Sequence, residues 1–73
     1  MDKEIIIEFL KGGGLNLYES KIYFSLLKYG VVTRSEIYKI AEVPQNRVYD
    51  ILTSLMAKSL VRTSNKDRHY LSK

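Results

Sequence analysis

The chain has 73 residues, with twelve lysines and arginines against eight aspartates and glutamates, one histidine and no cysteine. This length allows one small domain with a marginal core, and the lack of cysteine excludes disulfide bridges and thiolate metal sites. The net charge of +4 favours an anionic partner, nucleic acid first, although many small domains carry such a charge for solubility alone.

Targeting signals and membrane spans are not evident in the sequence. The N-terminus begins with acidic residues among its first four positions, unlike a signal peptide. No stretch approaches the roughly 18 consecutive apolar residues that a membrane span requires. We therefore expect a cytoplasmic protein that does not associate with membranes.

Residues 2–11 predict a short amphipathic helix, which the glycines at 12–14 end. Ile7 lies beside its broad apolar face, which consists of Ile5, Ile6, Phe9 and Leu10. This face either packs on its own domain through the glycine joint or pairs with a second subunit.

A second helix is predicted over residues 17–30, with Asn16 and Glu19 forming a capping box at its start. Its expected buried stripe is Ile22, Tyr23, Leu26 and Leu27. Residues 31–32 then read as a brief β-strand.

A third helix is predicted over residues 35–42, with a capping box at Thr33 to Glu36. Pro44 suits the first position of a fourth helix over residues 44–58. In the third helix the inward residues are Ile37, Ile40 and Ala41, and in the fourth they are Val48, Ile51, Leu52 and Leu55.

Residues 60–71 predict an antiparallel hairpin, because two runs of β-propensity flank a polar turn. Two helices joined by a short turn and followed by a hairpin are typical of a winged helix-turn-helix, a mostly helical α+β fold. We expect one such domain over residues 1–73.

Ordered motifs give a closer resemblance. The chain carries Ser35-Glu36-Ile37, Val43-Pro44, Val48-Tyr49-Asp50, Leu52, Leu55, Lys58, Leu60 and Val61. With this set, roughly residues 15–71 resemble the DNA-binding domain of the TrmB-like archaeal transcriptional regulators. The sequence departs from that family's pattern at Tyr38, where a small residue is usual, and at Glu42 and Ser59, where glycine is usual. The larger members carry an effector-binding domain that the resemblance does not cover, so no small-molecule effector is expected.

The first half of the fourth helix is the candidate reading face. Its polar positions are Gln45, Asn46, Arg47, Tyr49, Asp50 and Thr53. Amide side chains pair with adenine, arginine with guanine, and threonine contacts the thymine methyl group. A solvated helix face would have the same composition, but the capped helix before it and the basic hairpin after it favour base reading in the major groove.

Two positions on this face stay open. Asp50 either accepts a hydrogen bond from a cytosine amino group or orients Arg47 or another arginine. Tyr49 either stacks against the sugar-phosphate backbone or is half buried.

Basic character is local to the C-terminal segment, because residues 58–73 hold five lysines and arginines and a single acid. Such a wing contacts phosphates or the minor groove. The expected backbone and wing contacts are Arg34, Ser35, Tyr38, Arg62, Lys66, Arg68 and His69.

We therefore predict a sequence-specific regulator that binds double-stranded DNA and acts as a homodimer, at least on DNA, through the N-terminal helix. The alternative is a winged-helix protein-interaction module, because this fold does not fix function. No enzyme, metal site or cofactor is expected, because the acids are dispersed and no nucleophile–base pair is evident.

Overall fold

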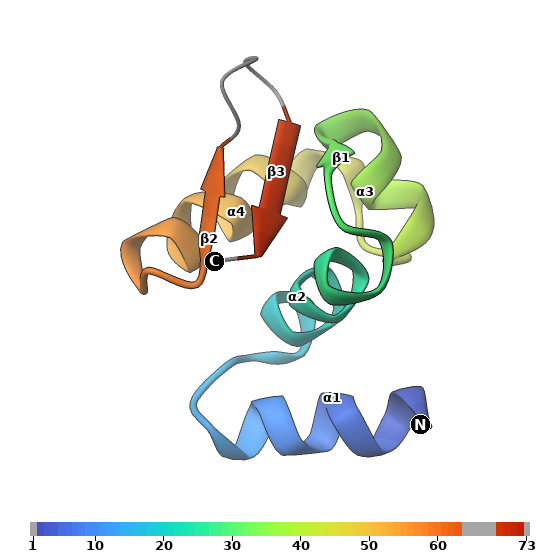
Figure 1. Cartoon of the computed structure of the whole chain (residues 1–73), viewed down its shortest axis with the longest axis vertical. Helices are drawn as coiled ribbons and strands as arrows, with labels where there is room; N and C mark the ends of the chain where they lie inside the picture. The colour runs from blue at the N-terminus through green and yellow to red at the C-terminus, as the bar shows by residue number, and fades with distance from the viewer. Residues whose placement is uncertain (1, 64–68, 73) are drawn as a thin grey trace.

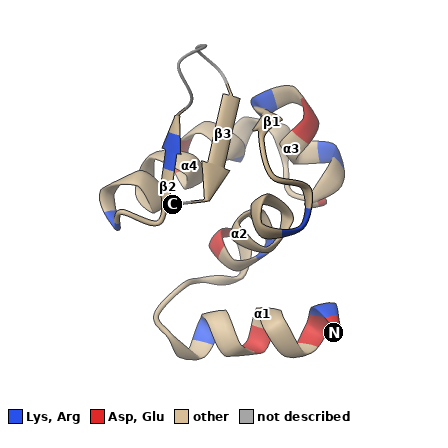
Figure 2. Ribbon diagram, in the orientation of Figure 1, with Lys and Arg blue, Asp and Glu red and all other residues tan. Residues whose placement is uncertain are grey.

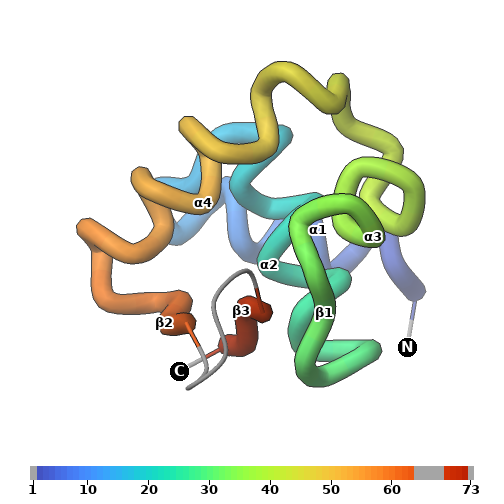
Figure 3. The backbone as a smooth tube through the Cα atoms, turned by 90° about the horizontal axis from the view of Figure 1, so that it is seen from above, coloured from blue at the N-terminus to red at the C-terminus, as the bar shows by residue number. Residues whose placement is uncertain are grey.

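The computed structural model describes residues 2–63 and 69–72. Over these residues the elements are α1 (Lys3–Gly12), α2 (Leu17–Tyr29), β1 (Val32–Thr33), α3 (Arg34–Ile40), a 3-10 turn (Gln45–Arg47), α4 (Val48–Ala57), β2 (Val61–Thr63) and β3 (His69–Ser72) (Figure 1). Helix α2 contacts α1, α3, α4 and β3. Seen from above, it lies near the centre, between α4 and the strands (Figure 3). The mostly helical winged helix-turn-helix fold is confirmed.

The wing is a three-stranded sheet rather than the isolated hairpin that the sequence predicts. Its strand order is β1-β3-β2, and both pairings are antiparallel. Val32 pairs with Tyr70, and Val61 pairs with Ser72. The first strand begins one residue later than predicted, because Val32 and Thr33 are the residues that pair with β3. The sheet thereby joins the start of α3 to the wing.

Helix α1 packs on its own domain through only part of the face that the sequence predicts, because Ile6 and Leu10 are partly buried whereas Ile5 and Phe9 are exposed. Ile7 is buried, and Leu10 packs against the core. Ile5 and Phe9 remain exposed, at 64% and 79% of their surface. The α2 side of α1 is therefore centred on Ile7, half a turn away from Ile5 and Phe9.

The glycine run ends α1 in a defined way. Gly14 has a positive φ of 106° and donates to the Lys11 carbonyl, while the Leu15 N–H donates to the Leu10 carbonyl. These two bonds form a Schellman motif, in which the left-handed position strongly favours glycine.

The predicted capping boxes are both present. The side chains of Asn16 and Thr33 accept from the N–H groups of Glu19 and Glu36, respectively, and each glutamate side chain accepts from the cap N–H in return. Each box satisfies backbone donors that would otherwise lack a partner at a helix start. These contacts fix where α2 and α3 begin.

The buried stripe of α2 differs from the prediction at one position. Ile22 and Leu26 are fully buried, but Leu27 is 53% exposed. A step of one residue rotates the side chain by about 100° around a helix, so Leu27 points away from the line that Ile22 and Leu26 define. Glu19 occupies that line instead, at 2% exposure.

Pro44 precedes the fourth helix instead of occupying its first position. Its ψ of 133° is extended, and a 3-10 turn over Gln45–Arg47 separates it from α4. The predicted inward residues of α4 are all buried: Val48, Ile51, Leu52 and Leu55. Ile37 in α3 and Ala41, the C-cap of that helix, are buried as predicted, and Ile40 is partly buried against the core.

Both positions at which family members usually carry glycine adopt left-handed backbone. Glu42 has φ 57° after α3, and Ser59 has φ 61° after α4. The Ser59 N–H donates to the Met56 carbonyl and the Leu60 N–H to the Leu55 carbonyl, which makes Ser59 the left-handed residue of a Schellman motif. The turns thus keep the geometry typical of glycine, at the expense of steric strain.

We expect the substitution Ser59→Gly to raise the free energy of unfolding by about 0.5–1 kcal/mol, because glycine removes the clash between Cβ and the backbone. Chemical denaturation measures the change. Ser59→Ala is the control and should give no gain, because alanine keeps the Cβ atom. Equal stabilisation by both substitutions would contradict this explanation.

Among the helices of the described residues, none has the length and apolar character needed to cross a membrane.

Candidate nucleic-acid interface

The predicted reading face lies on the outer side of the 3-10 turn and α4. Its side chains are all exposed: Gln45, Asn46, Arg47, Tyr49, Asp50 and Thr53. The buried stripe of α4 holds the opposite side against α2. The Thr53 hydroxyl donates to the Tyr49 carbonyl at 2.9 Å, so it can still accept a hydrogen bond, and the methyl group can contact thymine.

A hollow of about 470 Å³ lies where α3, α4 and β3 converge. Five of the predicted contact residues line it: Arg34, Ser35, Gln45, Tyr49 and His69. Thr33 and Val48 complete the lining. Lining residues from 33–35 and 45–49, which are 10 to 16 positions apart, meet in one recess because the turn between α3 and α4 folds one helix start against the other. Strand β3 brings His69 to the same recess.

The guanidinium group of Arg34 lies over the ring of Tyr49, with Cζ 5.3 Å from the ring centroid. Tyr49 is 58% exposed, so its ring is partly covered by the domain and partly open to solvent. A cation over an aromatic face is attracted to the ring quadrupole. Tyr49 therefore contacts the start of α3 as well as solvent.

The remaining predicted backbone contacts are distributed differently. Tyr38 is partly buried against the core, with the Lys39 ammonium 5.8 Å from its ring centroid. Arg62 is exposed on β2. Figure 2 shows basic positions on β2 and α3. Lys66 and Arg68 lie outside the described residues.

The two acids of this region have different surroundings. Glu36 accepts from the Thr33 backbone N–H and hydroxyl, and these bonds, with the nearby His69, lower the pKa of its carboxyl group. Asp50 is exposed and takes part in none of the ion pairs found within residues 2–63 and 69–72. That observation gives no support to Asp50 as an orienter of Arg47 in the free protein.

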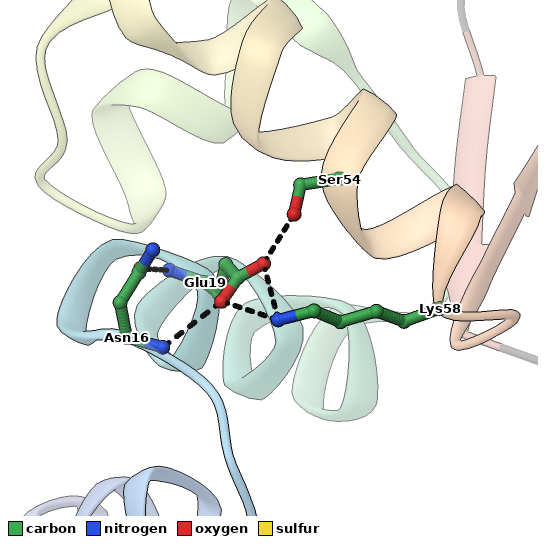
Figure 4. A network of polar contacts seen from close by, with 4 residues as sticks. All are labelled: Asn16, Glu19, Ser54 and Lys58. Atoms are coloured by element: carbon green, nitrogen blue, oxygen red, sulfur yellow. Dashed lines mark hydrogen bonds and ion pairs between the residues drawn. The ribbon is translucent and has the colours of Figure 1, made fainter.

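Glu19 anchors α4 against α2, a role that the local sequence pattern did not indicate. Its carboxylate accepts from Lys58 Nζ at 2.9 Å for each oxygen, from the Asn16 backbone N–H at 2.9 Å and from the Ser54 hydroxyl (Figure 4). The Glu19 side chain is 3% exposed and that of Lys58 is 41% exposed. The one sign of such a buried pair in the sequence is that Glu19 lies on the apolar stripe of its helix, together with Ile22 and Leu26.

This network stabilises the ionised form of Glu19. Burial favours the neutral carboxyl group, but the bonds from Ser54, the Asn16 N–H and Lys58 outweigh burial and hold the pKa of Glu19 below its ordinary value of 4.5. The Lys58 ammonium group, whose side chain is 41% exposed, is paired with this carboxylate. Lys58 is therefore not part of the free positive charge of the wing, although it is one of the five basic residues of positions 58–73.

No cluster of three or more histidine, cysteine, aspartate or glutamate side chains suited to a metal ion occurs in the described part of the chain.

Comparison with known proteins shows which family this chain belongs to. The family model described as "Sugar-specific transcriptional regulator TrmB" matches residues 10–72. The chain belongs to the TrmB family. The resemblance that the sequence motifs indicate is thereby confirmed.

Similar curated relatives include two TrmBL2 proteins. The chain is 41% identical over 64 residues to the putative HTH-type transcriptional regulator TrmBL2 of Pyrococcus furiosus, covering 86% of this chain and 24% of that protein. It is 42% identical over 59 residues to the DNA-binding HTH-type transcriptional repressor TrmBL2 of Thermococcus kodakarensis, covering 80% of this chain and 22% of the repressor. The chain thus spans about a quarter of the length of these TrmB-family relatives.

A solved structure supports the same assignment. The chain superposes over its whole length on 29% of a TrmBL2 chain, with a TM-score of 0.93 and 37% sequence identity. That protein is described as an archaeal chromatin protein whose structure shows a novel mode of DNA binding.

Proposed function

We propose that this chain binds double-stranded DNA as a sequence-specific transcriptional regulator, with the 3-10 turn and the first turns of α4 in the major groove. The observation that carries the proposal is the convergence of Arg34, Ser35, Gln45, Tyr49 and His69 on one recess beside the exposed start of α4. Its relatives are transcriptional regulators with helix-turn-helix domains.

The two kinds of contact are assigned to different elements. The exposed polar side chains Gln45, Asn46 and Arg47 supply groups that match base edges. Arg34 and the wing residue Arg62 supply positive charge for phosphates on either side of the reading helix. Phosphate contacts position the protein, and base contacts supply specificity.

Titration of the protein with duplexes from the region upstream of its gene tests the proposal. Fluorescence anisotropy should show binding that weakens steeply with salt, because phosphate contacts release counterions. One duplex should bind more tightly than a scrambled duplex of equal composition. Absence of binding to any duplex, together with specific capture of a protein partner, would favour the interaction module instead.

We further propose that the exposed face of α1 pairs two copies of the chain. Ile5 and Phe9 remain exposed after α1 has packed on α2, so they are available to a second copy without disturbing the domain. A single winged helix buries limited surface on DNA, and a two-fold dimer on a palindromic site doubles the contacts. Leu10, which packs within its own domain, is not part of this surface.

We expect the substitution Phe9→Glu to shift the protein to monomer with little change in the unfolding midpoint, because the ring is 79% exposed. Light scattering coupled to size exclusion measures the mass. Leu27→Glu, at a 53% exposed position on α2, is the matched control and should leave the mass unchanged. If the wild type is itself monomeric both free and on DNA, dimerisation through α1 is wrong.

A further inference from the structure

The contact between Arg34 and Tyr49 bridges the start of α3 and the first turn of α4. A cation–π contact uses none of the guanidinium N–H donors, so those of Arg34 remain available for hydrogen bonds. The ring restricts the otherwise flexible arginine, so less conformational entropy is lost when those donors bind a partner. Arg34 is therefore held ready for a ligand at the edge of the recess.

No described carboxylate neutralises Arg34. The ion pairs seen among residues 2–63 and 69–72 join Lys3 to Glu42, Lys11 to Glu8 and Lys58 to Glu19. Glu36, two residues after Arg34, is bonded to the N–H and hydroxyl of Thr33 at 2.9 and 3.0 Å. The positive charge of Arg34 thus remains for an incoming anion.

The lining of the recess matches a phosphate group. It offers the Ser35 hydroxyl and the amide of Gln45 beside Arg34, and none of the seven residues lining it carries a carboxylate. The Thr33 hydroxyl already donates to the Glu36 carboxylate at 3.0 Å. Arginine binds phosphate oxygens through parallel N–H bonds. Phosphates project from the duplex, whereas base edges lie at the floor of a major groove roughly 8.5 Å deep, so a recessed arginine meets a phosphate first.

We propose that this recess is a subsite for one phosphodiester group of the DNA backbone. Within it, Tyr49 is a positioning residue that holds Arg34 in place and does not read a base. This inference rests on the proposed DNA-binding function and assigns Tyr49 a different role from its neighbours Asn46 and Asp50 on the same face.

The test compares salt-dependent binding to a preferred and a scrambled duplex. Arg34→Ala should weaken both by the same factor and reduce the salt slope by about 1, as the loss of one phosphate contact does. Tyr49→Leu should weaken both duplexes equally, by roughly twofold to tenfold, as expected for a cation–π contact. Tyr49→Phe should bind like the wild type, because it keeps the ring.

Two further variants separate positioning from other roles. Tyr49→Leu should cause no additional loss in a protein that already carries Arg34→Ala. Tyr29→Leu is the matched control, because Tyr29 is 53% exposed and has Lys28 at 5.3 Å from its ring but does not line the recess. It should bind both duplexes like the wild type, and far-ultraviolet circular dichroism checks that each variant folds.

The outcomes distinguish this inference from the function on which it rests. If the wild type binds DNA but Tyr49→Leu changes the ratio between the two duplexes, Tyr49 reads a base and the inference is overturned. If the wild type binds no duplex, the proposed function fails, and titration with inorganic phosphate monitored by NMR decides the inference. Shifts at Ser35 and Gln45 that vanish in Arg34→Ala would support the subsite, and their absence would overturn it.

Discussion

We expect the substitution Lys58→Met to lower the free energy of unfolding by about 3 kcal/mol, at the lower end of the range for a broken buried ion pair. The Glu19 carboxylate, 3% exposed, would keep its bonds from Ser54 and Asn16 but lose its counter-ion. The lower end applies because Lys58 is 41% exposed and solvent already screens part of the attraction. Urea denaturation at neutral pH measures the change.

The control for this prediction is Lys3→Met, which removes an exposed ion pair. Lys3 Nζ lies 3.6 Å from the Glu42 carboxylate, and the two side chains are 42% and 74% exposed. Such pairs contribute at most about 1 kcal/mol. A similar loss in both variants would show that burial of Glu19 does not govern the effect.

The contribution of Glu19 to stability should depend on pH. Because the folded protein holds the pKa of Glu19 below 4.5, its stabilisation is complete above the unfolded pKa and disappears as the pH falls through the folded value. The difference between the wild type and Lys58→Met should therefore be largest at neutral pH and shrink in acid. Urea titrations at a series of pH values measure this difference, and one that is independent of pH would contradict the assignment.

Local patterns in the sequence predicted the features that depend on neighbouring residues. The capping boxes at Asn16 and Thr33 follow from polar side chains three positions apart, and both formed. The buried stripe of α4 follows from helical periodicity alone. Pro44 shows the limit of this reasoning, because its fixed φ suits the residue before a helix as well as the first residue within it.

Features that join distant residues could not be read from those patterns. Glu19 and Lys58 are 39 positions apart, and the pairing of β1 with β3 joins Val32 to Tyr70. Hydrophobic periodicity does not indicate which basic residue pairs with the Glu19 carboxylate. It also does not indicate whether the two-residue strand β1 pairs with the hairpin of β2 and β3. The cation–π contact between Arg34 and Tyr49 likewise depends on how the turn folds the two helices together.

We expect the substitution Arg47→Ala to weaken binding to the preferred duplex by roughly 1–3 kcal/mol, with a smaller loss on scrambled DNA. Arg47 lies at the end of the 3-10 turn, is exposed and makes no ion pair among the described residues. Its donors are therefore free to pair with the two acceptors of a guanine edge. Anisotropy titrations with both duplexes at one salt concentration measure the difference.

Arg62→Ala provides the matched comparison for Arg47, because Arg62 is also exposed and unpaired within the described residues but lies on β2. As a phosphate contact of the wing, it should weaken both duplexes equally and reduce the salt slope by about 1. Comparing the losses in the two variants therefore distinguishes an arginine that contacts a base from one that contacts a phosphate. If Arg47→Ala also weakens both duplexes equally, Arg47 binds phosphate, and specificity must come from Gln45, Asn46 and Asp50 or from the shape of the DNA.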